Sequence, residues 1–243
     1  MGPKIRLDQL LVQKGLAESR EKAKAMILTG LVQVDGVKVD KSGHLIPISA
    51  SISLKKTNPP YVSRGGLKLE AALKHFSVDV DGQVMMDVGA STGGFTDCLL
   101  QHGARKVIAV DVGYGQVDYR LRQDSRVVVM ERVNARYPIS LPEKVDLATI
   151  DLSFISVEKV IPSVAELLKD GGHLLVLIKP QFEARREEVG KRGVIKRPVV
   201  HARVLARFIS WIVEHGFRLK VLVASPILGA SGNREFFVLL KLT

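Results

Sequence analysis

Four ionisable side chains in this sequence could move a proton. Asp151, Lys179 and Glu235 lie at or just beyond the ends of predicted strands, in the segments IDLSF, LIKPQFE and NREFF. Lys68, in SRGGLKLE, comes before the sheet and could add a second cation. A lysine that ends an apolar strand loses hydration, which favours its neutral form, whereas nearby carboxylates favour the charged form. Such a cluster suits deprotonation of a ribose hydroxyl that attacks an activated methyl group. Taken singly, each residue could instead form an ordinary salt bridge at the rim of a sheet.

A glycine-rich segment, DVGASTGGF, joins the first strand of the predicted sheet to its helix. Ligands of open α/β sheets bind at the carboxyl ends of strands, where glycine lets the backbone approach them closely. Three residues separate Gly89 from Gly93, so the spacing is not that of a dinucleotide site. Asp111 ends the second strand, where its carboxylate could accept hydrogen bonds from both ribose hydroxyls of a nucleoside.

These features predict a nucleoside ligand that has no phosphates and whose positive charge suits Asp87 and Asp111. S-adenosylmethionine fits that description. The alternative is a glycine turn that only connects a strand to a helix. The expected cofactor-binding residues are Asp87, Gly89, Ala90, Ser91, Thr92, Gly93, Gly94, Phe95, Asp111 and Asn134.

Alternating strands and helices are predicted from about residue 80 onward. The expected strands are 84–88, 106–111, 126–130, 145–150, 172–178, 218–225 and 235–242, and the expected helices include 95–102, 157–168 and 199–215. Near-continuous apolar strands between helices indicate a parallel sheet covered on both faces, which gives an α/β fold with a seven-stranded Rossmann-like sheet. The last two strands have no helix between them, so we expect an antiparallel hairpin at the edge of the sheet.

A small α+β unit is expected at the N-terminus. Ser19 is a suitable N-cap for a second helix, Gly30 ends that helix, and Asp35-Gly36 predicts a turn between two short strands. The adjacent prolines of KKTNPPYVSRGG interrupt regular structure. We therefore expect a small domain over 1–56, a linker over 57–66 and a larger domain over 67–243.

The net charge of +11 is concentrated in two segments. Residues 1–56 hold 10 Lys and Arg against 5 Asp and Glu, and residues 183–207 hold 8 against 3. The remaining residues are nearly neutral, a distribution typical of a protein with two contact surfaces for a polyanion. The alternative is that both segments are solvated surfaces.

Composition and motif spacing argue against several other classes. A single cysteine forms no internal disulfide, the charged N-terminus MGPKIRLDQL lacks a secretory signal, and no apolar run approaches the roughly 18 residues of a membrane span. We therefore expect a cytoplasmic protein.

Asn58-Pro59-Pro60-Tyr61 matches a signature of amino-group methyltransferases but precedes the first strand of the sheet, and Cys98 is expected in the core rather than as a nucleophile. His173 and His201 lack metal-ligand spacing, so no metal is expected.

Motifs over nearly the whole chain resemble known families. Residues 5–56, with RLD, Ser19-Arg20, Ala23, Gly30 and VDG, resemble the small RNA-binding domain first known in ribosomal protein S4. DVGASTGGFTD, IDLSFIS, LIKPQFE and GNREFF together resemble the TlyA (hemolysin A) family, whose catalytic domain is similar to FtsJ-type RNA 2′-O-methyltransferases. YVSRGG also resembles that family's joint between domains.

This resemblance implies methylation of ribosomal RNA by S-adenosylmethionine, at a ribose hydroxyl of cytidine, with ribosomal RNA or ribosomal subunits as partners and no membrane partner. The family's Lys-Asp-Lys-Glu set would be Lys68, Asp151, Lys179 and Glu235. A loop over 183–197 would order on RNA. The expected RNA-binding residues are Arg6, Arg20, Lys22, Lys24, Arg64, Arg192, Lys196 and Arg197. The alternatives are a membrane-active hemolysin and an RNA-binding module without catalysis.

Overall fold

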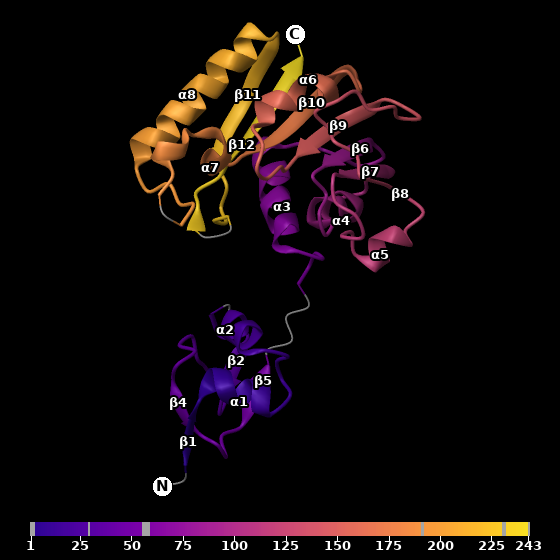
Figure 1. Ribbon diagram of the computed structural model, residues 1–243. Helices are drawn as coiled ribbons and strands as arrows, with labels where there is room; N and C mark the ends of the chain where they lie inside the picture. Colours follow the sequence, from indigo (N-terminus) through magenta and orange to yellow (C-terminus); the bar gives the residue numbers. More distant parts are fainter. Residues whose placement is uncertain (1–2, 29, 55–58, 191, 230–231, 243) are drawn as a thin grey trace. The chain divides into compact units, whose positions relative to one another are not determined.

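A computed structural model describes residues 3–28, 30–54, 59–190, 192–229 and 232–242 (Figure 1). The chain divides into two compact units, residues 1–58 and residues 59–243. Each unit has a hydrophobic core of its own.

The N-terminal unit combines two helices with short antiparallel strands. Its elements are β1 (Lys4–Arg6), α1 (Leu7–Gln13), α2 (Arg20–Leu28), β2 (Val32–Val34), β3 (Val37–Lys38), β4 (Leu45–Pro47) and β5 (Ile52–Leu54). β1 pairs with β4, and β2 lies between β3 and β5. The unit's core is formed by fully buried side chains that include Leu7, Leu10, Leu11, Ala23, Ile27 and Val32.

Two predicted details of this unit are confirmed. The backbone amide of Lys22 donates to Ser19 Oγ at 3.2 Å, so Ser19 caps α2. Asp35 and Gly36 both have positive φ, 50° and 79°, and Val34 pairs with Val37 across the turn. Positive φ at both central residues is the geometry that an Asp-Gly hairpin turn requires.

The larger unit is built on one seven-stranded sheet. Its strands are β6 (Val84–Val88), β7 (Lys106–Asp111), β8 (Val127–Glu131), β9 (Val145–Ile150), β10 (Leu168–Ile178), β11 (Phe217–Ala224) and β12 (Phe236–Leu242), in the order β11-β12-β10-β9-β6-β7-β8. β12 is antiparallel to both β10 and β11, whereas the pairs from β10 to β8 are parallel. The predicted Rossmann-like sheet and its antiparallel edge are confirmed.

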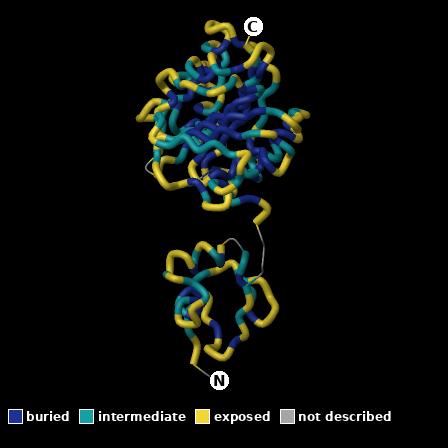
Figure 2. Tube along the Cα trace, turned by 90° about the vertical axis from the view of Figure 1, so that its right-hand side faces the viewer, coloured by how far each residue is buried: buried dark blue, intermediate teal, exposed yellow. Residues whose placement is uncertain are grey.

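Helices cover both faces of the sheet. One face packs against η1 (Val157–Lys159), α6 (Ile161–Ala165) and α8 (Pro198–Glu214), and the other packs against α3 (Arg64–Phe76), α4 (Gly94–Gln101) and α5 (Tyr119–Arg122). Successive strand residues alternate between the two cores, with Met85 on the α4 side and Met86 on the α8 side. Figure 2 shows these strands as the buried centre of the unit.

The structure differs from the sequence expectation in several segments. The helix expected over 157–168 is a short 3₁₀ turn followed by the five-residue α6, and Leu168 already belongs to β10. Pro162 at the start of α6 cannot donate to a preceding carbonyl, so one continuous helix cannot form there. Residues 64–66, expected in the linker, form the first turn of α3. The sequence analysis did not predict α3, α5, α7 (Pro180–Glu183) or η2 (Arg186–Glu188).

Candidate active site

The turn after β6 brings two strand ends into contact. Gly89 has φ +87°, and a Cβ at this position would lie 2.3 Å from the carbonyl oxygen of Asp151, at the end of β9. The Gly89 amide donates to the Val110 carbonyl of β7 at 2.8 Å. Only glycine combines this backbone conformation with so close an approach, so the turn fixes the ends of β6, β7 and β9 relative to one another.

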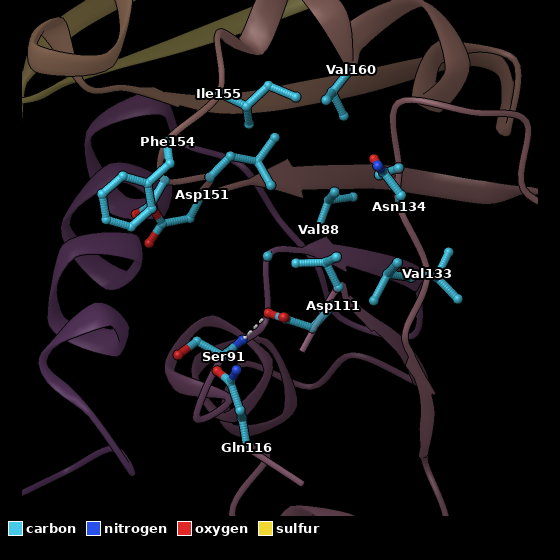
Figure 3. A pocket seen from close by; sticks show the side chains of 16 residues that line it. Val88, Ser91, Asp111, Gln116, Val133, Asn134, Asp151, Phe154, Ile155 and Val160 are labelled. Atoms are coloured by element: carbon cyan, nitrogen blue, oxygen red, sulfur yellow. Dashed lines mark hydrogen bonds between the residues drawn. The ribbon is translucent and has the colours of Figure 1, made fainter. Parts of the chain in front are cut away.

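Asp111 organises the loops around a cavity at the carboxyl ends of these strands. Its Oδ2 accepts from the Ser91 amide at 2.7 Å (Figure 3), and its Oδ1 accepts from the Gly113 amide at 2.7 Å. The cavity has a volume of about 480 Å³, and its lining includes Gly89, Ser91, Asp111, Gln116, Val133, Asn134, Asp151 and Phe154. An acidic group at the end of the second strand, beside apolar walls, can hold the ribose and base of a nucleoside.

Asp87 and Gly93, which the sequence predicts at the cofactor, do not line this cavity. They do not line the second cavity described below either. The Asp87 carboxylate is fully buried and accepts from the Thr96 amide (2.9 Å), the Thr96 hydroxyl (2.7 Å) and the Thr149 hydroxyl (3.1 Å). Burial raises the pKa of this carboxyl to about 6. Asp87 therefore holds α4 and β9 against β6. Gly93, with φ +91°, caps the start of α4.

A second cavity of about 450 Å³ holds the four ionisable residues expected to be catalytic. Lys179 Nζ lies 2.7 Å from Asp151 Oδ1 and donates to Ser153 Oγ at 3.1 Å. Lys68 Nζ donates to Glu235 Oε2 at 2.6 Å, and these two side chains are 12% and 2% exposed. The expected cofactor residues Ala90, Thr92, Gly94 and Phe95 also line this cavity, as does Arg64.

The two cavities share part of their lining: Gly89, Ser91, Asp151, Ser153 and Phe154. A ligand in the first cavity can therefore present a reactive group to one in the second. Asp151, which lines both cavities, and Lys179, which lines the second, can exchange a proton with a group bound in the second cavity.

Close helix packing positions Lys68. Ser63 caps α3, with Ser63 Oγ accepting from the Gly65 amide at 3.3 Å. A Cβ on Gly94 would lie 2.1 Å from Ser63 Oγ, and one on Gly66 would lie 2.2 Å from the Tyr61 ring. The glycines of SRGG and TGGF therefore let α3 and α4 approach closely, and Lys68 of α3 lines the second cavity together with Gly89.

Glu235 directly precedes β12 and is held against a glycine. A Cβ on Gly229 would lie 1.9 Å from Glu235 Oε1, so a larger residue at position 229 would displace the carboxylate. The Glu235 carbonyl also accepts from the Ser225 amide at 2.8 Å. These contacts leave Glu235 Oε2 to pair with Lys68.

The side chains that line the second cavity and were not predicted from the sequence include Ser153, Phe154 and Gln181. Phe154 is 90% exposed and has φ +66°, a strained conformation for an aromatic residue. Its ring lies 5.0 Å from that of Phe182. All three residues belong to the motifs DLSF and KPQF, from which only the charged residues had been selected.

Other sequence candidates lie away from the two cavities. Cys98 is buried in α4, and burial raises its pKa to about 12, as expected of a core thiol. Asn58 lies outside the described residues, while Tyr61 of the same motif is buried in the core. Within the described part of the chain, no three His, Cys, Asp or Glu side chains are grouped to hold a metal ion.

In the N-terminal unit, a buried carboxylate organises two of the expected RNA-binding residues. Arg6 donates to both oxygens of Asp8, at 3.0 and 2.9 Å, and Arg20 donates to Asp8 Oδ2 at 3.2 Å. Lys22 is exposed and pairs with Glu18, and Lys24 is half-buried. Asp8 therefore sets the positions of two arginines that keep part of their guanidinium surface in solvent.

The side-chain hydrogen bond from Arg6 lowers the pKa of Asp8 to about 2. Because this pKa lies below its unfolded value, the ionised carboxylate stabilises the folded unit above about pH 4, and that stabilisation is lost as the pH falls toward 2. We expect Asp8→Asn to cost about 1–2 kcal/mol at neutral pH, discounted for exposure of the arginines, and almost nothing near pH 2. Urea titrations followed by NMR signals of the Leu7 and Leu11 methyl groups measure the difference. An equal cost at both pH values would contradict the role of the ionised carboxylate.

Comparison with known proteins places this geometry in a family. The model of the FtsJ-like methyltransferase family matches residues 61–242, and the model of the S4 domain matches residues 5–51. This chain belongs to the FtsJ-like methyltransferase family. The predicted resemblance is therefore confirmed, and so are the predicted enzyme class and fold.

Relatives match this FtsJ-like methyltransferase over nearly its full length. "Putative rRNA methyltransferase YqxC" of Bacillus subtilis is 51% identical over 97% of this chain and 85% of its own. "16S/23S rRNA (cytidine-2'-O)-methyltransferase TlyA" of Mycobacterium tuberculosis is 40% identical over 99% of this chain and 91% of its own. A solved structure, "Putative hemolysin from Streptococcus thermophilus", is 45% identical with a TM-score of 0.78 and covers 100% of this chain and 90% of its own. Among the helices described for the present methyltransferase, none has the length and apolar content of a membrane span.

Proposed function

We propose that this protein transfers a methyl group from S-adenosylmethionine to the ribose 2′-hydroxyl of a cytidine in ribosomal RNA. The observation that carries the proposal is the arrangement of the Lys179–Asp151 and Lys68–Glu235 pairs in one cavity that shares part of its lining with the cavity beside Asp111. The name of the Mycobacterium tuberculosis relative supports both the 2′-oxygen and the cytidine. The S4 domain supports an RNA substrate.

The residues of the first cavity fit S-adenosylmethionine. Asp111 would hold the ribose hydroxyls, Gly89 and Ser91 would lie along the ligand, and the apolar side chains Val133 and Ile155 would contact the base. When bound, the cofactor supplies a methyl group on a positively charged sulfur. Asp151 lines both cavities and places a negative charge where they meet.

In the proposed reaction, Lys179 acts as the general base, for which it must first release the proton that its ion pair with Asp151 favours. Its Nζ takes the proton of the 2′-hydroxyl while the 2′-oxygen bonds to the methyl carbon, and the electrons of the broken carbon–sulfur bond stay on sulfur. Asp151 then stabilises the new ammonium group, to which it already lies 2.7 Å away. Lys68, held by Glu235, is positioned to bind the ribose or an adjacent phosphate.

The position of Phe154 supports a substrate nucleotide whose base is unstacked from its neighbours in the RNA. The exposed ring of Phe154 lines the same cavity as Lys179, the proposed general base, and offers a surface on which a nucleobase can stack, as is typical of RNA-modifying enzymes. The ring of Phe182 supports it from within the same motif as Lys179. The pair would hold the cytosine while its ribose reaches Lys179.

The basic flap, residues 183–197, would contact RNA phosphates. Changing Arg192, Lys196 and Arg197 to Gln is expected to weaken binding to ribosomal subunits and to lower the slope of log affinity against log salt by up to about 3, because each phosphate contact contributes roughly 0.7–0.9. Binding measured from low to moderate salt tests this. The matched control changes Arg218 and Lys220, exposed on β11 at the opposite end of the sheet, and should leave the slope unchanged. An unchanged slope in the flap variant would refute the role.

Methyl transfer itself tests the proposed function. The purified protein, incubated with S-adenosylmethionine labelled in its methyl group and with ribosomal subunits that lack the modification, is expected to place label in the RNA. Label that appears only in ribosomal proteins, or in neither component, would contradict the proposal.

A further inference from the structure

Asn233 is a buried side chain that the proposed chemistry does not use. It lies two residues before Glu235 and is 3% exposed. Its Oδ1 accepts from the Ile195 amide at 3.0 Å, and its Nδ2 donates to the Gly193 carbonyl at 2.8 Å. Both ends of the amide therefore bond to the backbone of the basic flap, on either side of Val194.

Other contacts hold the same part of the flap. The Gly193 amide donates to the Gly190 carbonyl at 2.8 Å, and the Gly190 amide donates to the Val194 carbonyl at 3.2 Å, so Gly190 is bonded to both Gly193 and Val194. Ile195 is 4% exposed and belongs to the core that contains Val200 of α8. These contacts anchor residues 193–195 to the larger unit.

This anchoring has an electrostatic consequence. Arg192, Lys196 and Arg197 flank the clamped residues 193–195, and all three are exposed. Within the described residues none of them forms an ion pair, unlike Arg203, which pairs with Glu188 at 2.8 Å. The clamp thus fixes the backbone from which three uncompensated cations project. A fixed array loses less conformational entropy on binding a polyanion than a mobile loop does.

We propose that Asn233 is a positioning residue that presets the basic flap for RNA and links it to the segment carrying Glu235. This inference rests on the proposed function, because it takes RNA as the polyanion. The short segment 232–235 then contacts the flap through Asn233 and Lys68 through Glu235. An RNA backbone bound to the flap is thereby held in register with the catalytic cavity.

The test measures salt-dependent binding of full-length variants to ribosomal subunits. Asn233→Leu removes both bonds to the flap, and we expect about tenfold weaker binding and a shallower salt slope. Asn233→Asp keeps the acceptor for Ile195 but loses the donor to Gly193, and it should fall between Asn233→Leu and the unmodified protein. The affinity for S-adenosylmethionine should stay within about threefold for both variants, because Asn233 does not line the cofactor cavity.

A double-mutant cycle separates positioning from general stability. In a protein whose Arg192, Lys196 and Arg197 are already Gln, Asn233→Leu should change subunit affinity by less than about twofold, because the cations through which Asn233 acts are gone. If the losses of subunit affinity caused by Asn233→Leu and by the three Gln substitutions multiply in the combined variant, the proposal is overturned. An unchanged salt slope in Asn233→Leu would also overturn it.

Hydrogen exchange at the Ile195 amide keeps the test decisive if Asn233→Leu does not fold. In Asn233→Asp, faster exchange together with a shallower slope would support the proposal, whereas faster exchange with an unchanged slope would overturn it. Failure of the unmodified protein to bind subunits would contradict the proposed function itself. If the unmodified protein binds subunits normally and its Asn233 variants bind equally well, only the role of Asn233 is contradicted.

Discussion

Lys179→Ala is expected to lower the rate of methyl transfer by about 10²–10⁴-fold, the range that a positioned general base contributes. Lys179 Nζ contacts Asp151 and Ser153 in the cavity that would receive the ribose, so its replacement removes the amine that would take the proton, while Lys68 stays paired with Glu235. Single-turnover assays with saturating S-adenosylmethionine and ribosomal subunits measure this step. Binding of subunits should be nearly unchanged.

The same strand offers a matched control. Lys169 lies near the start of β10 and pairs with Asp146 at 2.8 Å, much as Lys179, just after the strand, pairs with Asp151 at 2.7 Å. Lys169→Ala removes an equivalent charge at the opposite end of the sheet and should leave methyl transfer intact. Full activity in Lys179→Ala, or an equal loss in both variants, would contradict the assignment of the base.

Asp111→Ala is expected to weaken S-adenosylmethionine binding by about 100-fold. Hydrogen bonds to an ionised group contribute about 1.5–3 kcal/mol each. The Asp111→Ala variant would lose the hydrogen bonds from the ribose hydroxyls, and the amides of Ser91 and Gly113 would lose their acceptor. Calorimetric titration with the cofactor measures the change.

Asp79→Ala serves as the control for this prediction. Asp79 is exposed and accepts a local bond from the Asp81 amide, just before β6 and away from the cavity. Its replacement should leave cofactor affinity unchanged. If the unmodified protein itself fails to bind S-adenosylmethionine, the alternative of an RNA-binding module without catalysis gains support. Equal affinity for the unmodified protein and Asp111→Ala would remove Asp111 from the cofactor site.

Much of the fold could be predicted because apolar periodicity reports burial directly. β6, β7 and β9 begin and end at the predicted residues, since each is a short, nearly continuous apolar run between polar or glycine-rich segments. The helix α3 was missed because the glycine pair at its start reads as a linker. Those glycines serve a tertiary purpose, the close approach to Tyr61 and α4, which no local pattern reveals.

In the candidate site, too, local features could be predicted from the sequence and contacts between distant residues could not. Charged residues at strand ends could be selected from the sequence, because parallel strands direct their carboxyl ends to one edge. The pairing of Lys68 with Glu235 joins residues 167 positions apart, and only the structure shows that they meet. The place of Asp87 at the cofactor stays a prediction, and alternation along β6 turns its carboxylate into the interior, toward Thr96 and Thr149. Phe154 and Asn233 carry no charge, so charge patterning could not reveal them.

The most direct test of the central claim is mass-spectrometric mapping of methylated ribose in ribosomal RNA. Subunits that lack the modification are treated with S-adenosylmethionine and either the unmodified protein or Lys179→Ala. We predict new 2′-O-methylcytidine with the unmodified protein, and its loss or strong reduction with Lys179→Ala. A methyl group found on a base, or a 2′-O-methyl group formed equally well without Lys179, would contradict the account.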